Sequence, residues 1–151
     1  MRPGLPPLAV TAIAALASRL VSRAWPAPWL PPSIANGLSL ALALLGLTAC
    51  VAALRPFRRA GTTVDPTRPE RATTLVTSGI YRWSRNPMYL GMLLLLAGWT
   101  LHLGSLVALL VVPACFLLYL DRFQVVAEER ALATAFGEDY AAYARRVRRW
   151  I

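Results

Sequence analysis

Residues 86–120 read NPMYLGMLLLLAGWTLHLGSLVALLVVPACFLLYL, a run of 35 residues without Asp, Glu, Lys or Arg. A helix that spans a membrane needs about 20 apolar residues, so this run is too long for one helix. Small and polar residues interrupt it at His102-Leu103-Gly104-Ser105. The run therefore predicts a tight hairpin of two transmembrane helices, each of about 16 residues.

Two other charge-free runs lie nearer the N-terminus. Ala24–Leu54 has 31 residues and fits one helix over Ser33–Leu54, because Pro31 and Pro32 suit a helix start. The first segment, Leu5–Val21, fits either a retained span or a cleaved signal peptide, and both interpretations stay open. With that segment retained, we expect an all-α, multi-pass transmembrane helical bundle of about four spans.

Composition supports one membrane domain. The chain has 151 residues, of which 57% are hydrophobic and 15% charged, whereas soluble domains carry about 25% charged residues. This excludes a large multidomain enzyme and a disordered chain. We expect a single integral membrane domain over residues 1–151, with two N-terminal spans within residues 1–54.

The positive charges indicate how the bundle is oriented. All 16 basic residues are Arg; seven lie between Arg55 and Arg85, and six follow Leu120. The hairpin turn has none, so the positive-inside rule predicts that both Arg-rich segments and the C-terminus are cytoplasmic. Arg19 and Arg23 then fall on the outer side, against the rule. The charge does not indicate a nucleic-acid partner, because no basic helix with interleaved aromatics accompanies it.

Other common kinds of site have little support. The chain has one His, at the outer turn, and two Cys, both within predicted spans. We therefore expect no metal site and no His-based catalytic triad. Chemistry is expected in the two polar cytoplasmic segments instead.

The first of these segments leads into the hairpin. Arg82 and Arg85 stand just before Asn86-Pro87, which predicts a helix start. Free backbone N–H groups and the positive end of the helix dipole lie at such a start. Together with two Arg side chains, they suit an anion such as a ligand carboxylate.

The second segment, Asp121–Gly137, continues the last span as a helix that ends at Gly137. Glu128 and Glu129 are adjacent and point about 100° apart, so that one can face a site while the other pairs elsewhere. A last helix is predicted to begin at Glu138-Asp139. Its apolar face and its following Arg residues predict an amphipathic helix at the membrane surface. The apolar face comprises Phe136, Tyr140, Tyr143 and Val147.

Two motifs resemble the isoprenylcysteine carboxyl methyltransferase family and the related phospholipid methyltransferases. The first is Gly79-x-Tyr81-x-x-x-Arg85-Asn86-Pro87-x-Tyr89-x-Gly91, and the second is Glu128-Glu129 followed by Phe136-Gly137-x-x-Tyr140-x-x-Tyr143. The resemblance covers about two thirds of the chain, from Phe57 to Trp150. One departure is Asn86, where the family often has His, so a titrating base is absent at that position.

The resemblance implies an integral membrane methyltransferase that uses S-adenosylmethionine, with residues 55–151 as its cofactor-binding half. The acceptor would be lipid-like or prenylated, with a carboxylate as one candidate. Catalytic roles would fall to Arg85 and Glu129. The cofactor-binding residues would be Tyr81, Arg85, Asn86, Pro87, Tyr89, Gly91, Glu128, Glu129, Tyr140 and Tyr143.

Two alternatives stay open from the sequence. One is an NADPH-dependent membrane reductase of the sterol or polyprenol type, which has a similar Arg-x-Pro-x-Tyr element but is usually longer. The other is a non-catalytic membrane protein on the same scaffold, which Arg85, Tyr89 and Glu128-Glu129 argue against. The sequence does not indicate an oligomeric state.

Overall fold

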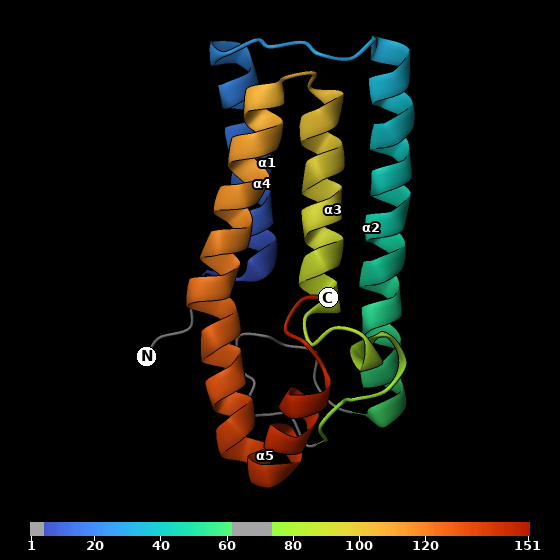
Figure 1. Ribbon diagram of the computed structural model, residues 1–151, viewed down its shortest axis with the longest axis vertical. Coiled ribbons are helices and arrows are strands. Elements are labelled where there is room, and N and C mark those ends of the chain that lie inside the picture. The colour runs from blue at the N-terminus through green and yellow to red at the C-terminus, as the bar shows by residue number, and fades with distance from the viewer. Residues whose placement is uncertain (1–4, 62–73) are drawn as a thin grey trace.

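Four helices stand side by side in the computed structural model, which describes residues 5–61 and 74–151 (Figure 1). They are α1 (Pro7–Ala24), α2 (Pro32–Ala60), α3 (Pro87–His102) and α4 (Leu106–Tyr119). All regular elements in the described ranges are helical. This confirms the expected all-α bundle of about four spans. The middle of the first Arg-rich segment, residues 62–73, lies outside the described ranges.

The outer surface of the bundle suits a bilayer. Large apolar side chains on three of the helices face outward, and Leu8, Leu40 and Leu110 are each more than 60% exposed. Three helices are long and apolar enough to cross a membrane: Pro7–Ala24, Pro32–Ala60 and the continuous Leu106–Arg146. The shorter apolar helix α3 has 16 residues and is about 24 Å long.

Helix α3 contacts the other three helices of the bundle. Its closest neighbour is α2, where Gly46 and Gly91 face each other. A Cβ atom added at Gly91 would lie 2.5 Å from Cys50 Sγ and 2.8 Å from the Gly46 carbonyl oxygen. The two helices therefore depend on glycine for their close approach.

The predicted hairpin turn is confirmed, because α3 ends at His102 and Ser105 caps α4 by accepting a hydrogen bond from the Ala108 amide. Helix α4 then continues through the π-helical segment η3 (Leu120–Val125) into α5 (Val126–Arg146). From Leu106 to a kink at Gly137 this helix is about 45 Å long, one and a half times the thickness of the apolar core of a bilayer. The apolar α4 forms the spanning part, and α5 lies beyond it.

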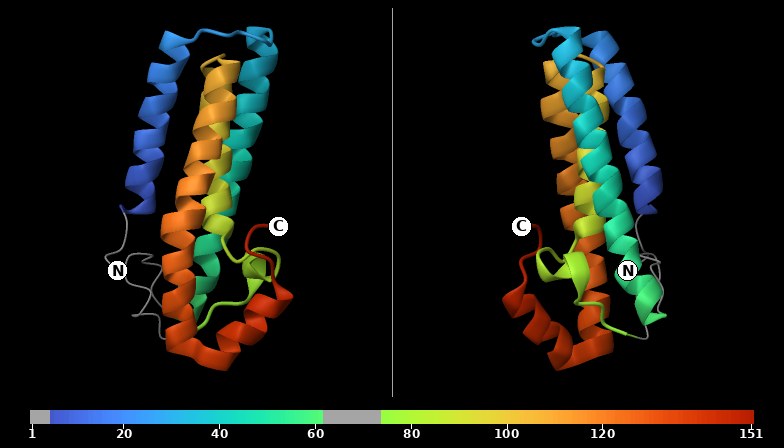
Figure 2. Two further views of the ribbon diagram at one scale, coloured as in Figure 1. Left: turned by 60° about the vertical axis from the view of Figure 1, so that its left-hand side comes forward. Right: turned by 90° about the vertical axis from the view of Figure 1, so that its right-hand side faces the viewer.

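One boundary differs from the sequence prediction and another agrees with it. Helix α2 continues six residues past Leu54 to Ala60, so that Pro56 lies inside the helix, where it removes one backbone hydrogen bond without ending the helix. The predicted helix end at Gly137 is confirmed, because α5 consists of two helical pieces that meet at a kink where Gly137 takes φ 51° and ψ −123°. A positive φ favours glycine. Figure 2 shows that the chain turns back there, toward the start of α3.

The predicted surface helix is wrong in two respects. Tyr140 and Tyr143 are buried in the protein, so this aromatic face does not lie on the membrane surface. The helix also ends at Arg146, and residues 147–151 form no regular element and bend at Val147 and Arg149. The physical reason is that packing against the protein buries the tyrosine rings while their hydroxyl groups find hydrogen-bond partners.

Candidate active site

The predicted site residues come mainly from three segments that meet at the end of the bundle. The short 3-10 helix η2 (Gly79–Arg82) carries Tyr81, whose ring packs edge-on against Phe57 of α2 at 5.4 Å between ring centroids. The residues that lead into α3 contribute Arg85, and α5 contributes the two glutamates. Residues 147–151, named here the C-terminal strap, contact the start of α3 and one of the two glutamates of α5.

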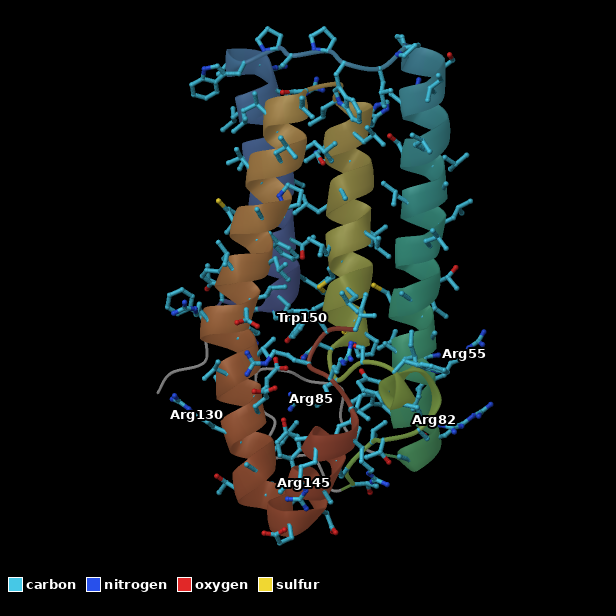
Figure 3. All side chains as sticks on the ribbon, in the orientation of Figure 1. Arg55, Arg82, Arg85, Arg130, Arg145 and Trp150 are labelled. Carbon is cyan, nitrogen blue, oxygen red and sulfur yellow. The ribbon has the colours of Figure 1, made fainter. Side chains whose placement is uncertain are left out.

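Arg85 points into the space between α5 and the chain end, whereas Arg55, Arg82 and Arg130 point outward (Figure 3). Its Nη1 atom lies 3.0 Å from Glu129 Oε1 and donates to the Tyr140 hydroxyl at 3.1 Å. The Arg85 side chain is 16% exposed, and its Nε atom is buried without a hydrogen-bond partner in the described part of the chain. A buried donor without a partner is costly, and a ligand acceptor would satisfy it.

Two arginine side chains compensate the negative charge of Glu129. Its Oε1 atom meets Arg85, and both of its oxygens accept hydrogen bonds from Arg149 of the C-terminal strap, at 3.1 and 2.6 Å. Arg149 also donates through Nη1 to Asp121 at 3.1 Å. Two arginines and two acids therefore balance within this cluster.

Glu128 has a different environment. Its carboxylate accepts hydrogen bonds from the Tyr89 hydroxyl and from Gln124 Nε2, which are both neutral donors. It makes no salt bridge with the residues that the structure describes. Burial raises the pKa of Glu128 to about 7. When Glu128 is ionised, no cationic side chain among the described residues compensates its charge. A cationic group of a ligand could therefore bind there.

The π-helical segment η3 brings Gln124 to this acid. Such segments are rare and often occur at functional sites. Gln124 is 3% exposed, and its Oε1 atom is buried without a partner in the described ranges. A polar side chain in such a place is expected to have a partner, which a ligand would supply.

The tyrosines of α5 form one wall of the site. Tyr143 donates a hydrogen bond to the Tyr81 carbonyl oxygen at 2.8 Å, and the rings of Tyr140 and Tyr143 lie 6.3 Å apart. Burial raises the pKa of Tyr143 to about 12, so its hydroxyl remains a neutral donor at physiological pH. The wall therefore presents apolar rings, and its hydroxyl groups already have hydrogen-bond partners in the protein.

The remaining predicted residues have distinct surroundings. Asn86 is buried and donates through Nδ2 to the Arg149 carbonyl oxygen at 3.0 Å. Pro87 is the first residue of α3, as expected from its fixed φ. Gly91 lies apart from the polar cluster, in the contact between α2 and α3.

Sequence reasoning missed Asp121, Gln124 and Arg149. Asp121 and Gln124 sit three residues apart, and Glu128 follows at helical spacing, which is a signal that the sequence does contain. From the sequence, Arg149 is one of the Arg residues that follow the predicted membrane-surface helix. Its role depends on the fold-back of the strap, which the sequence does not indicate.

Comparisons with known proteins fit this geometry. The family profile for phospholipid methyltransferases matches residues 34–139, more than two thirds of the chain. A protein of Haemophilus influenzae, described as uncharacterized, is 45% identical over 64 residues, which cover 42% of this chain and 100% of that protein. No solved structure matches the chain. The matched region includes α2, the hairpin and both glutamates, so the chain belongs to the phospholipid methyltransferase family of integral membrane proteins.

Proposed function

We propose that the protein is a membrane methyltransferase that uses S-adenosylmethionine and methylates a lipid-like or prenylated acceptor. Two features of the site carry this proposal. The Nε atom of Arg85 is buried without a partner, and Glu128 lacks a cationic partner among the described residues. A donor and an acid left in this way suit a ligand that contains both an anionic and a cationic group. The family match supports the methyltransferase class.

The residues present fit the cofactor. Its amino-acid part carries a carboxylate and an ammonium group, next to a positively charged sulfur. Arg85 would hold the carboxylate, and Glu128 would face the positive charge. The rings of Tyr81, Tyr89, Tyr140 and Tyr143 would pack against the purine.

When bound, this cofactor supplies a methyl group that is already activated. The work of the protein is therefore to align the acceptor, exclude water and stabilise charge. Arg85 and Glu129 would act together, because Glu129 fixes the guanidinium through Nη1. Asn86 and Pro87 would contribute the backbone of the α3 start, as at other helix termini that bind anions.

Two acceptor chemistries are compatible with the site. A carboxylate acceptor needs only a cation to orient it, whereas an amine or hydroxyl acceptor needs a base. Glu128 could serve as that base, because its pKa is raised to about 7. A methyl-label transfer assay with total lipid extract and with prenylcysteine analogues separates the two chemistries.

We propose that the site faces the cytoplasm, on the basis of the Arg-rich segments. The test uses single cysteines introduced as Leu103→Cys in the hairpin turn and Glu138→Cys in α5, after Cys50 and Cys115 are replaced by Ala. An impermeant maleimide should label residue 103 in intact cells and residue 138 only in inverted vesicles. The reverse labelling pattern would refute this orientation.

Calorimetry on the detergent-solubilised protein tests the cofactor. Binding is expected with S-adenosylmethionine and with S-adenosylhomocysteine, and not with NADPH. Arg85→Ala and Glu129→Ala should each weaken binding by about tenfold or more, because each removes a charged hydrogen-bond partner. Heat with NADPH alone would instead identify a reductase.

A further inference from the structure

The C-terminal strap is bound to the segment that leads into α3. The Arg148 carbonyl oxygen accepts a hydrogen bond from the Arg85 amide at 3.0 Å, and the Arg149 carbonyl oxygen accepts one from Asn86 Nδ2 at 3.0 Å. The indole of Trp150 donates to Asp121 Oδ1 at 3.1 Å and packs against the bundle core. The strap therefore has a defined place across the site.

The side chain of Arg149 engages Glu129 as a two-pronged pair. Arg149 Nε lies 3.1 Å from Oε1 and Arg149 Nη2 lies 2.6 Å from Oε2. Its third nitrogen, Nη1, binds Asp121 at 3.1 Å. Two-pronged arginine–carboxylate pairs are strong and fix the orientation of both groups.

This pair determines how Glu129 meets Arg85. Both oxygens of Glu129 are engaged by Arg149, so Glu129 reaches Arg85 through one contact, between Oε1 and Nη1. The hydroxyl of Tyr140 accepts from the same Nη1 atom. The Nε atom of Arg85 is left buried and without a partner in the described ranges, and a guanidinium uses this edge to bind a carboxylate with two hydrogen bonds.

We propose that Arg149 is a positioning residue that engages both oxygens of Glu129 and so keeps the Nε edge of Arg85 available to a ligand carboxylate. This inference rests on the proposed function, because the carboxylate is that of the cofactor. Without Arg149, the free carboxylate of Glu129 would form its own two-pronged pair with Arg85. The protein itself would then occupy the anion site.

The experiment measures S-adenosylhomocysteine binding by calorimetry to the full-length protein. Arg149→Gln should lower the affinity by about tenfold or more. Glu129 would then pair with Arg85, and the ligand carboxylate would have to displace it. The double variant Glu129→Gln with Arg149→Gln should recover part of this loss, because an amide oxygen at position 129 still accepts from Arg85 Nη1 but forms no charged two-pronged pair that competes with the ligand. Arg148→Gln is the matched control, since the Arg148 side chain is exposed and only its backbone contacts Arg85.

Recovery in the double variant separates positioning from a merely structural role. If Arg149 only stabilises the fold, the double variant binds as weakly as the single variant, and the inference is wrong. If Arg149→Gln binds more tightly than the wild type, the strap blocks the site, and the inference is also wrong. Absence of binding to the wild type would instead refute the proposed function.

Discussion

The hydroxyl of Tyr89, in the first turn of α3, donates a hydrogen bond to the carboxylate of Glu128 in α5. The bond joins the two halves of the sequence motif across the hairpin. Gln124 donates to the same carboxylate oxygen at 3.0 Å. Glu128 is therefore held by neutral donors, which fix its position and leave its charge uncompensated among the described residues.

Replacing Tyr89 tests this arrangement. Tyr89→Phe removes one of the two donors and leaves a buried carboxylate poorly satisfied, which should lower the free energy of unfolding by about 1–3 kcal/mol. Thermal unfolding in detergent measures the effect. Tyr119→Phe is the control, because the described residues offer its hydroxyl no hydrogen bond and its ring contact with Phe123 is kept. Equal losses in both variants would contradict the role of the bond.

The pKa of Glu128 predicts a dependence of stability on pH. Burial raises this pKa from 4.5 to about 7, so the folded state favours the neutral acid. The stabilising contribution is complete below about pH 4.5 and is lost as the pH rises through about 7. Glu128→Gln keeps the side chain neutral and should flatten the melting temperature between about pH 4.5 and pH 7, the window that the two pKa values set.

The exposed Glu138 provides the control for this titration. Its side chain is 93% exposed, so Glu138→Gln should leave the pH profile of the wild type unchanged. A Glu128→Gln profile that still falls between about pH 4.5 and pH 7 would assign the titration to another group.

The four helices could be predicted from sequence because membrane spans leave a simple signal. Charge-free runs must be long enough to cross the bilayer, and Gly104-Ser105 marks the turn between two of them. The end of α2 was less predictable, since Pro56 suggests a break, whereas the helix continues past it and ends at Gly61, which takes φ 60°.

The site could be predicted only in part. Arg85, Tyr89 and Glu128 stand in recognisable motifs, and the structure brings them together with Glu129. Arg149 was not predictable, because it differs in sequence context very little from Arg148, whose side chain is exposed. What separates the two is the irregular path of the strap after Arg146, which brings the Arg149 side chain to Glu129 and leaves that of Arg148 exposed.

Close packing of α2 and α3 makes a prediction at Gly91. Gly91→Ala places a methyl group 2.5 Å from Cys50 Sγ and should destabilise the protein by about 1–3 kcal/mol, because the helices must separate. Gly37→Ala lies in the same helix pair but meets nothing within 4 Å, and should be neutral or stabilising by up to about 1 kcal/mol. Thermal unfolding in detergent compares the two. An unchanged melting temperature in Gly91→Ala would show that α2 and α3 can move apart without loss of stability.

Asn86 provides the test of how the strap is held. Its Nδ2 atom donates to the Arg149 carbonyl oxygen at 3.0 Å. An imidazole N–H can make the same donation, whereas Asn86→Ala cannot, so Ala should favour detachment of the strap by about 0.5–1.5 kcal/mol.

Digestion with a carboxypeptidase, followed by mass spectrometry, reports this detachment directly. A loss of that size changes the detached fraction by up to about tenfold, and the rate of tail removal should rise by the same factor in Asn86→Ala. Asn86→His should be digested as slowly as the wild type. Rapid digestion of both variants would mean that Asn86 holds the strap by its shape, and that the hydrogen bond to Arg149 contributes little.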